Sequence, residues 1–325
     1  PTWLVLAICL VLHVTPCAAS TENVSEFISI LEETGFTVQE GRLGKLNVLE
    51  LCSAGYVNYC FGNNAGFPYA IYILPPSIGQ DPSPRQAPPM AYDPDAADNY
   101  PANLDTVPAG MTYKLRPDEA IVLVGNTPPP ARYFSFRSYL GFVENKPGKD
   151  YTGTPTFGDD EIGWYHRIYC SLGDPLNHLN MWTSNTPGGA AGNAFGSATV
   201  LITTADRGMN RMMRDALTAA GYSPDIINDD NIPPSLVHMG LEKGKDTFLI
   251  IMRAALWDQP NVGSDYLDNI GDHMRVFRIT PNTPVAAGEP WPVPALRVRE
   301  TGVSEYQTIP NAAADLEHLR QEIIR

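Results

Sequence analysis

The sequence predicts an α+β fold with a mostly antiparallel β-sheet or sandwich, a few flanking helices and long proline-rich loops. Short runs rich in β-branched and aromatic residues, which are typical of strands, recur along the chain. Few segments repeat apolar residues at the spacing of an amphipathic helix. The 325 residues include 30 prolines and 27 glycines. So many prolines favour a loop-rich, β-leaning fold over a helix bundle.

An apolar run of signal-peptide length, residues 3–14, lies near the start of the chain and is too short to span a bilayer. Small residues follow it, so we expect a signal peptide over 1–20 with cleavage near Ala19 or Ser20. The protein would then be secreted or lie in the secretory-pathway lumen. A membrane anchor and a buried helix are the alternatives. Because the first residue is Pro1 and not Met, we expect the true start to be missing.

Residues 21–325 form the expected secreted globular region, either as one body or as two β-rich subdomains meeting near 150–195. No later run approaches 18 apolar residues, so we expect no membrane span after signal removal. The net charge of −14 argues against nucleic acid or an anionic membrane as the main partner. It favours cationic ligands or a divalent metal.

The first half of the chain begins with a predicted helix from Asn23 to Gly35, where Asn23 and Glu26 have capping-box spacing. The leucine spacing over 43–51 suggests a second short helix that closes at Gly55. Residues 69–74 read as a strand. The proline-rich stretch 75–108 has no periodicity and is expected to be a surface wrap.

The second half contains most of the predicted strands. Residues 119–140 predict a hairpin, with two strands joined by a tight Thr-Pro-Pro-Pro turn. Asp206 is a good N-cap for a helix that ends at Gly221. This helix, the strand before it and a return strand over 223–228 make a compact α/β unit. The further strands are 163–171, 247–252 and 274–280, and a terminal helix starts at Asn311.

Three cysteines follow the predicted leader, which itself contains Cys9 and Cys17. Cys52 and Cys60 could close a small disulfide loop, which leaves Cys170 free and buried. Three reduced core thiols are the alternative, because three cysteines are not a disulfide framework.

Three predicted strands share an arginine inside an apolar run: Arg137, Arg253 and Arg278, with Arg132 as a fourth candidate. A desolvated guanidinium needs an anionic or hydrogen-bonding partner, and its planar fork suits carboxylate, phosphate or sulfate. We therefore expect these strand-borne arginines to bind a small anionic molecule. Alternatively, each arginine pairs with a core carboxylate or points to solvent.

Two further readings rest on other polar residues. The first is a hydrolase or lyase in which His178 is the general base, oriented by Asp174 or Asp206. His166, Cys170 and His178 are zinc-ligand types, but their spacing matches no closed zinc motif.

The second reading is a calcium-stabilised surface protein that uses Asp93, Asp95 and Asp98, which place hard oxygen ligands close together. Solvated loop charge is the alternative for these aspartates. The sequence contains none of the nucleophile, phosphate-loop or dinucleotide motifs.

Residues 100–142 carry short motifs that match a known family. Asn103, Asp105 and Thr106 are followed by the apolar strand 120–124 and then by Arg132-Tyr133-Phe134. This pattern resembles secreted β-rich proteins of the domain-of-unknown-function 1254 type, which have an Asn-x-Asp-Thr step, a strand and an Arg-Tyr-aromatic strand. The resemblance implies a β-sandwich and no catalytic residue.

Overall fold

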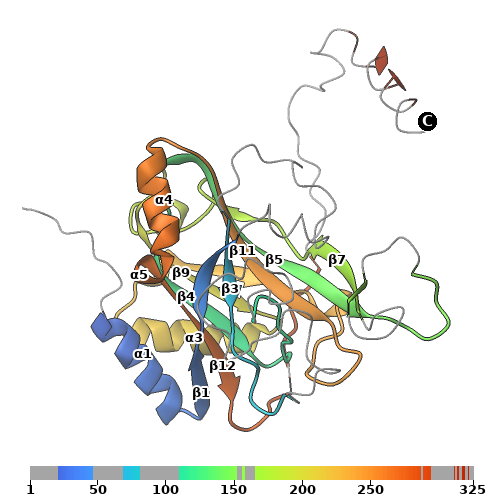
Figure 1. Cartoon of the computed structure of the whole chain (residues 1–325). Coiled ribbons are helices and arrows are strands. Elements are labelled where there is room, and N and C mark those ends of the chain that lie inside the picture. The colour runs from blue at the N-terminus through green and yellow to red at the C-terminus, as the bar shows by residue number, and fades with distance from the viewer. Residues whose placement is uncertain are drawn as a thin grey trace, which may run out of the picture. The chain divides into compact units, whose positions relative to one another are not determined.

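A computed structural model of the chain describes residues 21–46, 69–80, 110–151, 156–157, 165–286 and 288–293, with single residues between 311 and 321 (Figure 1). Residues up to Pro292 form one compact unit and Val293–Arg325 form another. Among the described residues, no helix is long and apolar enough to cross a membrane.

The first sheet, called sheet A here, has five described strands in the order β1-β12-β4-β9-β10. They are β1 (Phe36–Glu40), β12 (Met274–Pro281), β4 (Ala120–Asn126), β9 (Ala198–Thr204) and β10 (Ile227–Asn231). All neighbours are antiparallel except β9 and β10, which are parallel. The helix α3 (Arg207–Ala219) connects that parallel pair, which confirms the predicted α/β unit, although its return strand runs over 227–231 and not over 223–228.

The second sheet, called sheet B, has seven described strands in the order β2-β3-β11-β5-β7-β6, with β8 also paired to β5. They are β2 (Arg42–Leu46), β3 (Tyr69–Ile73), β11 (Thr247–Trp257), β5 (Ala131–Glu144), β7 (Tyr165–Ser171), β6 (Thr156–Phe157) and β8 (Leu176–Asn177). Every pairing is antiparallel. The predicted α+β fold with mostly antiparallel sheet is therefore confirmed.

The main core lies between the inner faces of the two sheets. Phe134, Phe136 and Phe248 of sheet B pack there with Ile121 and Leu123 of sheet A. Figure 1 shows α1 (Thr21–Glu33) and α3 together on the other side of sheet A. A second apolar cluster joins both helices to that face of the sheet, with contributions from Phe27, Leu31, Met209, Met213, Leu217, Val122, Val124 and Ile202. The layers are thus helices, sheet A and sheet B.

The remaining helices are short. α4 (Pro260–Asp268) and α5 (Ile270–His273) link β11 to β12, and sequence reasoning missed both. Single 3-10 turns occur at Pro187–Gly189, Pro224–Ile226 and Pro234–Leu236. α1 starts two residues earlier than predicted and ends before Gly35, whose φ of 93° terminates it as expected.

The predicted hairpin over 119–140 is wrong. Both strands exist, but β4 belongs to sheet A and β5 to sheet B, so the segment 127–130 carries the chain between sheets. The three consecutive prolines 128–130 lack N–H groups and cannot form a ladder of backbone hydrogen bonds. β4 instead pairs with β9 and β12, which come much later in the chain.

Two smaller expectations also need correction. Residues 42–46 form strand β2 against β3 and not the start of a helix, because antiparallel pairing overrides the leucine spacing. Cys170 is free as expected but exposed rather than buried. Cys52, Cys60, the rest of the predicted second helix and most of the 75–108 wrap lie outside the described residues.

Candidate functional site

The outer face of sheet B brings two of the predicted arginines together. In the β5–β11 ladder Arg137 lies opposite Ile251, and Arg253 lies opposite Ser135. The two arginines are therefore diagonal neighbours on adjacent strands, and side chains two positions apart on a strand share one face. The alternation of burial along β11, where Met252 is buried and Arg253 is partly exposed, places them on the face away from sheet A.

Each guanidinium stacks on a tyrosine ring of the same face. The guanidinium carbon of Arg137 lies 5.9 Å from the Tyr139 ring centroid, and that of Arg253 lies 5.3 Å from the Tyr133 centroid. Both distances are within cation–π range. We call Arg137, Tyr139, Arg253 and Tyr133 the arginine–tyrosine face.

The Tyr139 hydroxyl lies within the electrostatic influence of both arginines. Burial raises the pKa of the Tyr139 hydroxyl, while the positive charges of Arg137 and Arg253 both act to lower it. One hydroxyl therefore feels both guanidiniums. The apolar cluster beneath it contains Ile71, Ile73 and Leu249, so this face is itself largely buried.

Neither arginine of this face forms an ion pair with a carboxylate in the described part of the chain, although Arg137 acts at longer range on the buried Asp230 carboxyl. Arg137 and Arg253 form no ion pair with any residue that the structure describes, whereas five other arginines do: Arg116, Arg211, Arg214, Arg275 and Arg278. In addition, the Nε of Arg137 is buried without a hydrogen-bond partner. A buried N–H donor without an acceptor is unfavourable, so an acceptor is expected at this position.

A third guanidinium lies beside this face. Arg167 of β7 stacks on Tyr169 with 5.4 Å between guanidinium carbon and ring centroid. Tyr169 packs on the same apolar cluster as Tyr139. Its φ of 48° is left-handed, which is costly for a residue with a side chain and is found disproportionately at functional sites.

Arg278 does not join the other two arginines. It is fully buried on sheet A and forms an ion pair with Glu119, with 3.1 Å between Nη1 and Oε2. Its Nη1 also donates to the Lys114 carbonyl oxygen at 3.0 Å. The sequence left open the alternative that each arginine pairs with a core carboxylate, and Arg278 does so.

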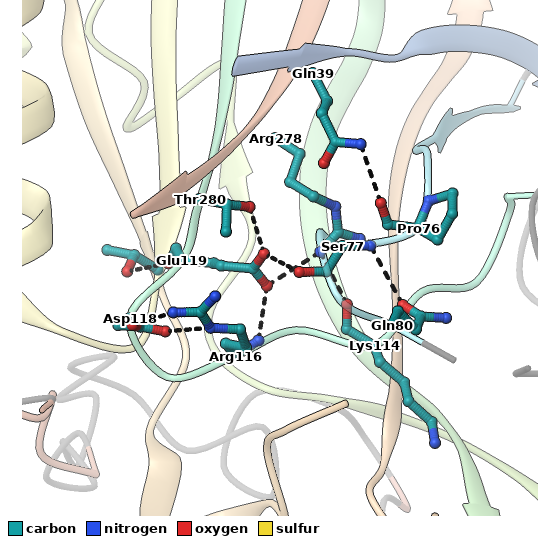
Figure 2. A network of polar contacts seen from close by, with 11 residues as sticks. Gln39, Pro76, Ser77, Gln80, Lys114, Arg116, Asp118, Glu119, Arg278 and Thr280 are labelled. Atoms are coloured by element: carbon teal, nitrogen blue, oxygen red, sulfur yellow. Dashed lines mark hydrogen bonds and ion pairs between the residues drawn. The ribbon is translucent and has the colours of Figure 1, made fainter. Parts of the chain in front are cut away.

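Glu119 collects the donors around that ion pair, as Figure 2 shows. Its carboxylate accepts from the Thr280 hydroxyl at 2.6 Å, from the Arg116 backbone N–H at 2.8 Å and from the Ser77 hydroxyl. A buried charge with this many donors is well satisfied. The Glu119 carboxylate is thus satisfied within the core, whereas Nε and Nη2 of Arg278 are buried without a hydrogen-bond partner among the described residues.

Arg132 also lies apart from the arginine–tyrosine face. It is exposed and precedes Tyr133 on β5, so strand alternation directs it to the opposite side. Of the four predicted arginines, the structure brings together Arg137 and Arg253 only.

The residues of the predicted hydrolase or lyase site are dispersed. His178 is partly buried among the rings of Tyr133, Phe134 and Phe195, and its Nδ1 has no hydrogen-bond partner. Asp206 caps α3 by accepting from the Met209 N–H at 2.9 Å, so its carboxylate serves the helix. Asp174 is exposed in the loop between β7 and β8, and no described contact joins either aspartate to His178.

Metal ligation finds no support among the described residues. They contain no group of three His, Cys, Asp or Glu side chains able to hold an ion. His166, one of the zinc-ligand types, uses its Nδ1 in a hydrogen bond to Asn145 at 2.8 Å. Asp93, Asp95 and Asp98 lie outside the described residues, so the calcium reading stays a prediction.

Sequence reasoning missed the tyrosines of the site. Tyr133 and Tyr139 flank Arg137 at even spacing along β5, a period-two signal that could have placed all three on one face. The contribution of β11 depends on long-range register and has no local signal.

Comparison with protein-family models, with curated proteins and with solved structures gave no match.

Proposed function

We propose that this chain is an extracellular binding protein that holds a small anion on the outer face of sheet B through Arg137 and Arg253. One observation carries the proposal: two partly buried arginines are diagonal neighbours on one face, and neither forms an ion pair with a described carboxylate. The predicted signal peptide over 1–20 supports the extracellular part.

The physical argument starts from repulsion between the two arginines. Two like charges on diagonal neighbours of one sheet face repel each other, more strongly than in bulk water because the site is partly buried. An anion between them replaces this repulsion with two attractive contacts. The arrangement is therefore more favourable when it is occupied.

The tyrosines define which part of each arginine the ligand can contact. A guanidinium that stacks on a ring keeps its in-plane N–H groups available, and those groups match the oxygens of a carboxylate, phosphate or sulfate. The buried Nε–H of Arg137 is one such donor without an acceptor. Tyr139 adds a hydroxyl that both guanidiniums influence.

Calorimetric titration with phosphate, sulfate and succinate tests the proposal. We expect wild type to bind at least one of them and Arg137→Gln or Arg253→Gln to weaken that binding about tenfold or more, since a charge-assisted hydrogen bond contributes about 1.5–3 kcal/mol. Arg137→Lys should not restore affinity, because it lacks the planar fork.

Arg132→Gln is the matched control. It removes the same charge from the same strand, but on the opposite side of the sheet. If it weakens binding as much as Arg137→Gln, the effect comes from net charge alone and the site is wrong. Absence of binding by all three anions to wild type would also contradict the proposal.

A further inference from the structure

A cleft that shares no residue with the arginine–tyrosine face lies among three loops of the first unit. Its volume is about 910 Å³, and its walls come from residues 116–118, 239–243 with Lys245, 284–286 and Gly79. This is within the range of about 300–1,000 Å³ that is usual for small-molecule sites.

Specific hydrogen bonds hold the walls of the cleft. The Val285 N–H donates to Asp118 Oδ2 at 2.9 Å, and the Gly240 N–H donates to the Leu115 carbonyl oxygen at 2.9 Å. The fully buried Lys114 donates its Nζ to the Glu242 carbonyl oxygen at 2.7 Å. A cleft held in this way needs little ordering when a ligand binds.

The turn 116–118 is anchored in the buried network of Figure 2. The Arg116 N–H donates to Glu119, and the Arg116 guanidinium pairs with Asp118 at 2.5 Å. The Glu119–Arg278 network thus lies directly behind one wall. The Glu119–Arg278 network therefore helps to fix the shape of the cleft at the turn 116–118.

Most charged groups of the cleft are already neutralised. Arg116 pairs with Asp118, and Lys243 lies 3.6 Å from a Glu144 oxygen. Lys245 and Glu242 are different, because neither forms an ion pair with another residue in the described part of the chain. Lys245 and Glu242 therefore remain for a ligand, although the Glu242 carboxylate also acts electrostatically on the buried Lys114.

These two groups lie against the same glycine. A Cβ atom built on Gly240 would be 2.6 Å from Glu242 Oε2 and 3.1 Å from Lys245 Cε. The Glu242 carboxylate and the methylene chain of Lys245 thus lie side by side, and a ligand that carries both signs on neighbouring atoms could reach both charged groups. Met239, Leu241 and Val285 supply apolar surface in the same cleft.

We propose that this cleft binds a free α-amino acid with a large apolar side chain. Its carboxylate pairs with Lys245, its ammonium pairs with Glu242, and its side chain lies on the apolar walls. The ammonium and carboxylate of an α-amino acid share one carbon, whereas the termini of a peptide lie apart. The adjacency of Glu242 and Lys245 therefore fits the free amino acid better than a peptide.

The probe is phenylalanine, titrated by calorimetry beside phenylalanine amide, which lacks the carboxylate, and N-acetylphenylalanine, which lacks the ammonium. We expect phenylalanine to bind wild type and each blocked compound to bind at least tenfold more weakly. Glu242→Gln should weaken the binding of phenylalanine but leave the binding of N-acetylphenylalanine unchanged. Lys245→Met should weaken the binding of phenylalanine but leave the binding of phenylalanine amide unchanged. This crossed pattern separates direct contact from a general loss of structure.

Lys45→Met is the control, because Lys45 pairs with Asp268 at an exposed surface site and does not line the cleft. It should bind phenylalanine as wild type does. The proposal is overturned if phenylalanine does not bind at millimolar concentration, if the blocked compounds bind as well as phenylalanine, or if only a phenylalanine-containing tripeptide binds. None of these three results bears on the proposed anion site on sheet B, since the two sites share no residue.

Discussion

At the scale of single residues, Glu119 and Arg278 illustrate how a buried charge is tolerated. Both side chains are fully buried, and Glu119 accepts from four different residues. Desolvation of two ions is unfavourable by several kcal/mol each, and mutual attraction and hydrogen bonds offset this cost. Arg278 donates through Nη1, while its Nε and Nη2 have no partner among the described residues. Removing one ion leaves the other buried without compensation.

Arg278→Met should therefore lower the free energy of unfolding by about 3–5 kcal/mol. Arg275→Met is the matched control on the same strand, because Arg275 pairs with Glu40 at a partly exposed site. That surface pair should contribute at most about 1 kcal/mol. Urea unfolding of both variants measures the difference, and equal losses would contradict this account of the core.

Asp230 presents a second buried charge with an effect that depends on pH. Its carboxyl accepts hydrogen bonds from the Thr203 hydroxyl at 2.9 Å and from the Ser138 hydroxyl. The second bond connects sheet A to sheet B, because Ser138 belongs to β5. Burial raises the pKa of the Asp230 carboxyl above its usual value, although the hydrogen bonds act in the opposite direction. The folded state thus holds this proton to a higher pH than the unfolded state does.

The sign of the resulting stability change follows from proton linkage. Between the unfolded-state pKa near 3.8 and the raised folded-state pKa, the folded state binds more protons, so stability falls as pH rises. Asp230→Asn keeps an acceptor for both hydroxyls and removes the titration. We expect its unfolding free energy to fall less than that of wild type as pH rises from about 4 to 7. A steeper fall in the variant would show that the carboxylate is stabilised when ionised.

At the scale of elements, α4 depends on one close approach that its sequence does not reveal. A Cβ on Gly263 would lie 2.1 Å from the nearest atom of the Trp257 indole, which belongs to the end of β11. No real Cβ makes such a contact, so a side chain here must push the ring or the helix away. Gly271 of α5 has nothing within 4 Å of the same position.

Gly263→Ala should therefore destabilise the protein by about 1–3 kcal/mol through overpacking. Gly271→Ala, the control in the next helix, should be neutral or stabilising by up to about 1 kcal/mol, because alanine restricts the unfolded chain. Thermal unfolding of the two variants compares them. If the two changes have the same sign and size, the packing of α4 on Trp257 is not as described.

The elements also show what could be predicted from sequence and what could not. Strand runs such as 198–204 and the Asp206-capped helix have strong local signals, and both formed as expected. The hairpin over 119–140 was wrong because the segment 127–130 is not a tight turn but connects the two sheets, so β4 and β5 have other partners. Pairing of β4 with β12 joins residues about 150 positions apart, which no local pattern encodes.

The prediction that Arg278 lies with Arg137 and Arg253 was wrong for a related reason. β12 is covered by helices on one side and by sheet B on the other, so its residues are almost all buried and show no alternation. Nothing in the sequence around Arg278 then indicates which layer it enters. β11 alternates toward its end, and Arg253 could be placed only once its partner strand was known.

At the scale of the whole molecule, a chain with a net charge of −14 presents unpaired cations on one face. Long-range repulsion of an anion by this net charge is largely screened beyond about 8 Å at physiological ionic strength. Direct contacts with Arg137 and Arg253 then decide affinity. The acidic surface and the cationic site are therefore compatible, and binding is best measured near 0.15 M salt.

The central claim is that Arg137 and Arg253 together contact an anion on the outer face of sheet B. The most direct measurement is an NMR titration of arginine Nε–Hε signals with phosphate, sulfate and succinate, assigned by single-arginine variants. We predict that the Arg137 and Arg253 signals shift together along one saturable curve for the anion that binds, while Arg132 and Arg275 do not move. Uniform small shifts of all four, or no shift of Arg137, would contradict the account.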